Sequence, residues 1–195
     1  MRRFAPARLP VLVLAAAGAV ALAGCAADGN VAATGRGTSA TASAAATPAV
    51  TSAADCAGVF VTVQFGLLGA DDVNACDPAT RPVTASAALN AVGVTTEGTK
   101  RYGDQVVCRV NGEPSASEPV HVPGHPAYTE TCDAMPASFA YWAMWVRDSA
   151  TGKWRYAQNG VDTEQLKPGQ TLGLKFTTGS DTTAPTPPPT GSPQG

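Results

Sequence analysis

The large apolar and aromatic residues of this 195-residue chain are confined to two stretches, which limits the part that can fold. All three Trp, all four Tyr and four of the five Phe lie between residues 55 and 178. Small and polar residues dominate the flanking segments 26–54 and 179–195, which bury too little apolar surface to form a core. We therefore expect one globular domain over 55–178, a disordered tether before it and a disordered Pro/Thr/Ser-rich tail over 179–195.

The first 24 residues have the organisation of an export signal. Three arginines precede an uncharged apolar run, Leu9 to Ala23, that is short for a membrane span. The run ends in Leu22-Ala23-Gly24-Cys25, which resembles the lipobox of bacterial lipoproteins. In that family the Cys thiol is alkylated with diacylglycerol and a peptidase cuts just before it. The resemblance implies a signal peptide over 1–24 and a lipidated Cys25 at the start of the tether, 25–54. An ordinary signal peptide with a chance Cys is the alternative.

Such an anchor would hold the domain at the extracellular face of the cell membrane without spanning it, since two acyl chains anchor a protein stably. Three of the thirteen basic residues precede Cys25 and all fifteen acidic residues follow it, so the mature chain carries a net charge of −5. A chain of this charge without a basic stripe is not expected to bind nucleic acid. The expected partners are the membrane, through the lipid on Cys25, and a membrane transporter or other envelope protein.

Four cysteines remain after Cys25, at positions 56, 76, 108 and 132. Four cysteines allow three pairings, and an exported protein meets an oxidising environment, so two disulfides are expected. We favour Cys56–Cys76 and Cys108–Cys132, because each pair closes one local excursion of the chain. Their spacing is unlike that of a zinc site, where cysteines come in close pairs. We predict neither a metal nor a cofactor.

Hydrophobic patterns predict an α+β domain with a mostly antiparallel sheet and one helix. Residues 84–92 place apolar side chains at i, i+3, i+4 and i+7, with Thr84 as N-cap and Gly93 after the helix. Residues 58–65 alternate and predict a half-buried strand, followed by an acidic loop. The remaining strands are expected at 105–110, at 141–146 with 153–156 as an aromatic hairpin, and at 171–176.

The order of these segments resembles the β-grasp domain found at the C-terminus of transcobalamin and intrinsic factor, which also occurs alone in bacterial surface proteins. Besides the first strand and the helix, the pieces that carry the resemblance are 107–112, 141–145, 154–156 and the turn at 167–169. It implies a small β-grasp-like fold over about 58–177. The helical domain that holds much of the cobalamin in the vitamin carriers has no counterpart here, so we carry over no cobalamin residue.

Two polar groups offer metal-ligating side chains, and a solvated loop is the favoured interpretation of both. The first is His121 and His125 with Glu118 or Glu130, where Pro123 and Gly124 rule out the regular helix that would align the histidines. The second is Asp71, Asp72, Asn74 and Asp77, which lack the spacing of an EF-hand loop.

Aromatic residues of the hairpin are the candidate ligand-binding residues: Trp142, Trp145, Trp154 and Tyr156. Alternation places Tyr141 and Trp145 on one face of their strand and Trp142 on the other. A sheet covered by one helix buries only one face well, so at least one Trp should lie on the less covered face. Such clusters stack on flat ligands or anchor protein partners, although core and cross-strand packing is the alternative interpretation.

Motifs of the common catalytic classes are missing, so we expect no enzyme activity. The predicted function is a non-catalytic ligand- or protein-binding module, for which an accessory of an uptake system is one option. The alternative is a structural or interaction protein of the envelope without a small-molecule site. A concave pocket beside Trp142 or Trp154 would favour the first function, and a flat, filled face the second.

Overall fold

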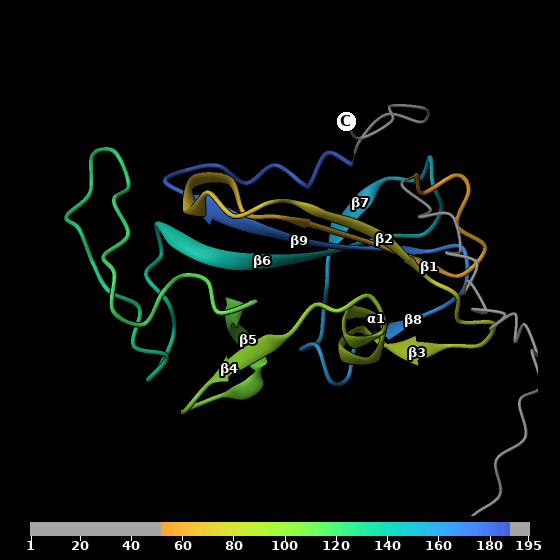
Figure 1. Cartoon of the computed structure of the whole chain (residues 1–195), viewed down its shortest axis with the longest axis horizontal. Helices are drawn as coiled ribbons and strands as arrows, with labels where there is room; N and C mark the ends of the chain where they lie inside the picture. Colours follow the sequence, from red (N-terminus) through yellow and green to blue (C-terminus); the bar gives the residue numbers. More distant parts are fainter. Residues whose placement is uncertain (1–51, 188–195) are drawn as a thin grey trace, which may run out of the picture. The chain divides into compact units, whose positions relative to one another are not determined.

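A five-stranded mixed sheet forms the centre of the structure, a computed structural model that describes residues 52–187 (Figure 1). The strand order is β2-β1-β9-β6-β7, with β1 parallel to β9 and the other three pairs antiparallel. These strands are β1 (Val59–Gln64), β2 (Val73–Asp77), β6 (Ala140–Arg147), β7 (Trp154–Tyr156) and β9 (Thr171–Thr178). Since residues 52–187 contain one α-helix beside these strands, the domain is a small α+β fold, as the sequence predicted.

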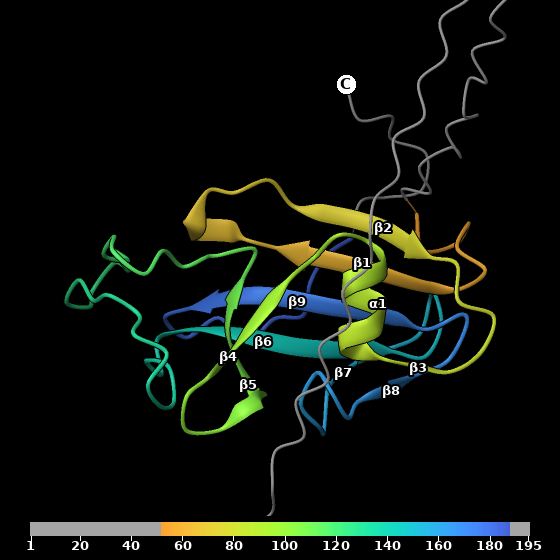
Figure 2. The same ribbon diagram turned by 60° about the horizontal axis from the view of Figure 1, so that its bottom comes forward.

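Helix α1 (Ala85–Ala91) packs on one face of this sheet (Figure 2). The Thr84 side chain caps it by accepting a hydrogen bond from the Ala87 amide at 3.2 Å. Gly93 follows with φ 77°, in the left-handed region where a glycine is favoured. Ala85, Ala88 and Leu89 are buried against the core, so the predicted cap and apolar face are both confirmed.

Two small antiparallel pairs lie on the same side of the main sheet as α1 (Figures 1 and 2). They are β3 (Val83–Thr84) with β8 (Gln165–Leu166), and β4 (Thr96–Thr99) with β5 (Gly103–Val110). Between these pairs, α1 and the sheet lies the core, whose fully buried members include Val61, Leu89, Val110, Leu166 and Leu174.

The expected acidic loop after the first strand is partly ordered structure. It contains a 3-10 turn, η1 (Gly66–Leu68), and the edge strand β2, which pairs with β1 along its length. Its sequence, Val-Asn-Ala-Cys-Asp, has no apolar alternation, so no pattern marked it as a strand. Long-range contacts specify it instead: the Cys76 disulfide and the Thr62 hydroxyl, which donates to Asn74 Oδ1 at 2.9 Å.

Strand β1 is buried on both faces rather than half-buried as expected. Phe60 and Thr62, which point away from α1, are as inaccessible as Val61 and Val63. The face opposite α1 is covered because the chain after β9 turns back across it (Figure 1). This segment, 179–187, falls in the predicted tail, so ordered contacts extend beyond the expected domain boundary at 178.

Two disulfides join Cys56 to Cys76 and Cys108 to Cys132, each with a Cα–Cα distance of 5.6 Å. This is the pairing that closure of local excursions predicted. The first disulfide ties the chain before β1 to β2, and the second ties β5 to the far end of the long loop that follows it.

The predicted signal peptide (1–24), the lipidated Cys25, the tether up to residue 51 and the tail from 188 onward lie outside the described residues. Within 52–187, no helix has the length and apolarity needed to cross a membrane.

Candidate functional site

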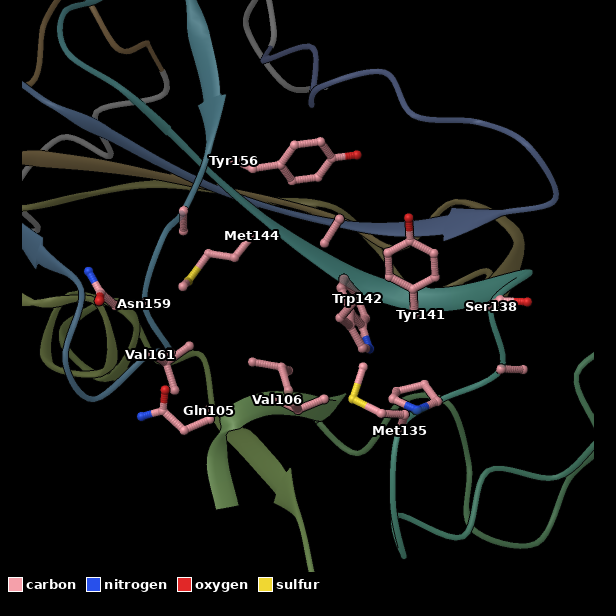
Figure 3. Close-up of a pocket in the computed structure, with 16 residues that line it drawn as sticks. Gln105, Val106, Met135, Ser138, Tyr141, Trp142, Met144, Tyr156, Asn159 and Val161 are labelled. Carbon is pink, nitrogen blue, oxygen red and sulfur yellow. The ribbon is translucent and has the colours of Figure 1, made fainter. Parts of the chain in front are cut away.

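A slot of about 590 Å³ opens at one edge of the main sheet, between β6 and β5 (Figure 3). Apolar side chains dominate its walls, among them Val106, Met135, Met144 and Val161. None of the sixteen described residues that line it is charged. The slot therefore favours a neutral, mostly apolar ligand.

The slot exists because β7 is much shorter than β6. Strand β7 pairs only with Trp145, Val146 and Arg147, and the ladder ends where the Ala157 amide donates to the Met144 carbonyl at 2.9 Å. Backbone groups of alternate residues point to the same side of a strand, so the N–H and C=O of Trp142 also point away from β9, into the slot. The first half of β6 thus offers a peptide donor and acceptor there.

The opposite wall is β5. At one end of the slot, the start of β5 contacts the backbone of residues 160 and 161, which follow β7. The Val161 amide donates to the Asp104 carbonyl at 3.1 Å. At Gly160 a Cβ atom would lie 2.5 Å from both the Asp104 oxygen and the Gln105 Cα, so only glycine fits. This contact closes the slot beside residues 157–161.

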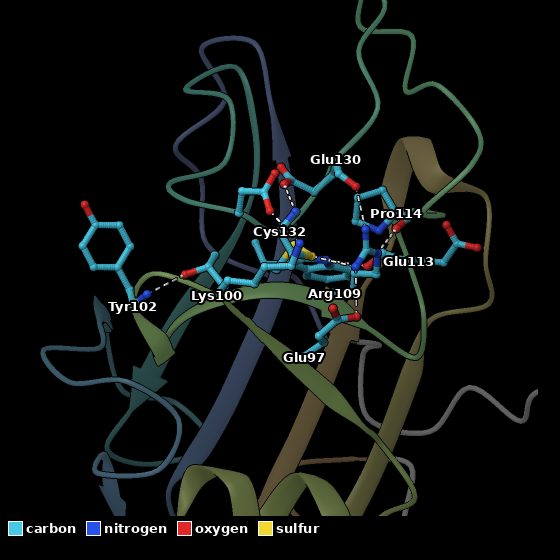
Figure 4. The surroundings of a disulfide bond; sticks show 12 residues. Glu97, Lys100, Tyr102, Arg109, Glu113, Pro114, Glu130 and Cys132 are labelled. Carbon is cyan, nitrogen blue, oxygen red and sulfur yellow. Dashed lines mark hydrogen bonds and ion pairs between the residues drawn. A yellow bond between two sulfur atoms is a disulfide. The ribbon is translucent and has the colours of Figure 1, made fainter.

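Arg109 and the second disulfide hold the other end (Figure 4). Arg109 is 7% exposed, and its guanidinium donates to the carbonyls of Pro114 at 2.9 Å and Glu130 at 2.6 Å. It also pairs with Glu97 at 2.9 Å and contacts the Cys132 sulfur. These bonds fix both ends of the 113–131 loop against β5, and the chain that follows the disulfide forms the Met135 side of the slot.

Trp142 is a rigid wall of the slot rather than a free stacking platform. It is 6% exposed, its Nε1 donates to the Glu113 carbonyl at 2.9 Å, and its ring packs edge-on against Phe65 and Phe176. Tyr141 and Tyr156 lie at the rim on the other side of β6 (Figure 3). Burial, and to a lesser degree Tyr141 and Asp181, raise the pKa of Tyr156 above its ordinary value, so its phenol stays neutral.

The four predicted aromatic residues do not form one site. Trp142 and Tyr156 line the slot, whereas Trp145 and Trp154 do not. Trp145 stacks on Tyr156 with ring centroids 3.7 Å apart, and the Arg147 guanidinium lies over Trp154 at 4.7 Å, both on the face opposite α1. The alternation that put Trp142 and Trp145 on opposite faces is confirmed.

Sequence reasoning missed the rest of the slot. Two of its walls are short irregular segments, 135–138 and 157–161, and no periodicity shows that they are neighbours. Met135, which is 63% exposed, gives no sequence signal either, since single exposed apolar residues are ordinary on protein surfaces.

Five of the eight polar candidates have local partners. The His125 ring stacks on Phe139 at 4.2 Å, and the buried Glu130 accepts from the Cys132 amide. Asp72, Asn74 and Asp77 accept separate hydrogen bonds around β1 and β2. Within 52–187, the one cluster of metal-ligating side chains is Cys108, Glu130 and Cys132, whose sulfurs are bonded to each other.

Comparison with known proteins adds no relative: no family model matches the chain, and no curated protein or solved structure is significantly similar to it.

Proposed function

We propose that this chain is a lipid-anchored, non-catalytic binding module at the extracellular face of the membrane that captures a small neutral ligand in the slot. The observation that carries the proposal is the concave, uncharged cavity of about 590 Å³ beside Trp142. Ligand sites typically have about 300–1,000 Å³, mostly apolar walls and a few polar groups that fix orientation.

The walls define the chemistry of the ligand. Met135 and Met144 are flexible and polarisable and adapt to rings or chains of varied shape. The Trp142 backbone and the Tyr141 hydroxyl offer hydrogen bonds. A charged group would be desolvated without a counter-charge among the lining residues, which is costly. The ligand is thus neutral and largely apolar, with one or a few hydrogen-bonding groups.

Two observations support the location. Paired disulfides are typical of proteins in oxidising, extracytoplasmic compartments. The lipobox-like end of the apolar leader, Leu22 to Cys25, would give the anchor. A tethered binding module of this kind would deliver its ligand to a neighbouring membrane transporter.

Tryptophan fluorescence provides the test. Residues 25–195 with Cys25→Ser would be exported behind an ordinary signal peptide, purified with both disulfides intact and titrated with neutral corrinoids, riboflavin and monoacylglycerols. We expect a saturable change for one class, because Trp142 forms a wall of the slot. No response to any class would favour the alternative, an envelope interaction protein without a small-molecule site.

A matched pair of variants would locate the binding. Met135→Glu puts a charge at the exposed mouth of the slot and should weaken the ligand about tenfold. Leu67→Glu makes the same change at another exposed apolar residue that does not line the slot, and should leave affinity unchanged. Equal affinities for both variants would place the ligand elsewhere.

A further inference from the structure

The segment after β9 crosses the face of the main sheet opposite α1, as the blue trace in Figure 1 shows. Lys175 forms an ion pair with Asp181 at 2.8 Å and donates to the Thr183 hydroxyl at 2.7 Å. Farther along, Gln64 Nε2 donates to the Thr186 carbonyl and Gln64 Oε1 accepts from the Thr186 amide. The side-chain amide of Gln64 on β1 therefore makes two hydrogen bonds to the backbone of Thr186, one as donor and one as acceptor.

Pro185 is the buried residue of this segment, and the sheet is shaped around it. It lies over Gly173 in the middle of β9, where a Cβ atom would come within 2.7 Å of the proline ring and 3.1 Å of the Trp154 ring. Glycine weakens a strand interior, so its presence there indicates a close approach from above. A proline held beside an indole is the arrangement by which aromatic grooves bind extended proline-rich peptides.

The tail leaves some buried polar atoms of this face of the sheet without a hydrogen-bond partner. Three buried polar atoms have no hydrogen-bond partner within the described residues: Trp145 Nε1, Arg147 Nε and Thr171 Oγ1. The strand register puts Trp145 beside Gly173 and Arg147 beside Thr171, so all three lie on the face of the sheet that Pro185 covers at Gly173. Trp145 Nε1 and Arg147 Nε can only donate and the Thr171 hydroxyl can donate or accept, and an extended proline-containing peptide offers carbonyl oxygens that such donors can bind.

We propose that this face is a docking site for an extended peptide segment of another envelope protein, and that residues 181–187 are its resident, displaceable occupant. The tail's own contacts define the partner segment. It needs a carboxylate that pairs with Lys175 and, four residues later, a proline that packs on Gly173 and Trp154. It also needs a backbone amide that donates to Gln64. Displacement needs no opening of the core, because residues 182, 183 and 186 are exposed and the Asp181 carboxylate is partly solvated.

Competition by a labelled peptide tests the proposal. The peptide has the sequence of residues 180–190 and is titrated, by fluorescence anisotropy, into the mature chain in its natural form and with Pro185→Asp. Since the resident tail occupies the site, the variant should bind the peptide at least tenfold more tightly. A chain carrying Pro119→Ala, an exposed proline of the long loop, should behave as the natural chain does.

Exchanging the charges of Lys175 and Asp181 between the chain and the peptide separates a loss of binding from a loss of folding. With Pro185→Asp already in place, adding Lys175→Glu should weaken the peptide at least fivefold, and a peptide in which Asp181 is replaced by Lys should restore its affinity. Equal binding to the natural and Pro185→Asp chains, or no binding to either, would show that the tail is a fixed part of the fold and overturn the proposal. A concentration-dependent dimer of the natural chain would identify the occupant as a second copy, and would also overturn it.

Discussion

Arg109 holds the irregular 113–131 loop in place against β5. Its planar guanidinium reaches two carbonyls and one carboxylate that lie far apart along the chain, which a point charge on a lysine could not do. Glu97 is more than half exposed, so the ion pair itself contributes little, and the buried carbonyl contacts matter more.

Replacing Arg109 by Met should lower the free energy of unfolding by about 2–4 kcal/mol, because it leaves the carbonyls of Pro114 and Glu130 without their donor. Urea titration of the oxidised protein measures the change. Arg101→Met, at an exposed position of the β4–β5 turn, is the control and should change stability by less than about 0.5 kcal/mol. A loss no larger than that of the control would mean that the disulfide alone holds the loop.

At the scale of elements, the segments that the sequence predicted are those whose own pattern matches their environment. Helix α1 has a cap and an apolar stripe, β9 alternates at Leu172, Leu174 and Phe176, and β6 is rich in aromatic and apolar residues. Strand β2 and the β3–β8 pair have no such pattern, because their pairing is specified by partners distant in the chain. The slot could not be predicted for the same reason: it lies where β7 ends early, a property of the hairpin's length rather than of any motif.

The docked tail should depend on pH. Hydrogen bonds from Lys175 and Thr183 hold the pKa of the Asp181 carboxyl well below its usual range. A depressed pKa in the folded state means that the contact stabilises the tail above the ordinary carboxyl pKa, about 3.9, and is lost as the pH falls through the lower, folded value. Residues 181–187 should therefore be more protected at pH 7 than near pH 2.

Hydrogen exchange at the two pH values, corrected for the intrinsic rates, measures this difference. Asp181→Asn should reduce protection at pH 7 and remove most of the pH dependence. The amides of β9, which belong to the sheet, are the internal reference. Protection that is the same in Asp181→Asn as in the natural chain would show that the ion pair does not hold the tail.

For the whole molecule, the proposed membrane anchor depends on Cys25. Changing Cys25 to Ser removes the thiol that the lipobox-like sequence would present for alkylation. We expect uncleaved precursor or protein in the medium, detected by phase partition in detergent and by the mass of the N-terminal peptide. A variant that is still processed and still enters the detergent phase would contradict the lipoprotein proposal.

The two disulfides should contribute a large share of the stability of the domain, because its helix contributes little burial beyond Leu89. The chain-entropy model assigns roughly 3 kcal/mol to a loop of about 20 residues, and the bridges here span 20 and 24 positions. The free energy of unfolding of a domain of this size is typically about 5–15 kcal/mol, so the contribution of two bridges is comparable with it. Full reduction should melt the domain or bring it close to melting.

Removing the bridges one at a time should separate two effects. Replacing Cys56 and Cys76 by Ser should lower the free energy of unfolding by about 3 kcal/mol and leave the slot intact, since that bridge lies at the other edge of the sheet. Replacing Cys108 and Cys132 should lower it by a similar amount and also release the 113–131 loop, which Arg109 alone would then hold against β5. Hydrogen exchange of that loop and the affinity of the slot should therefore change only in the second variant. Both variants unfolding within about 0.5 kcal/mol of the natural chain would show that the core needs neither bridge.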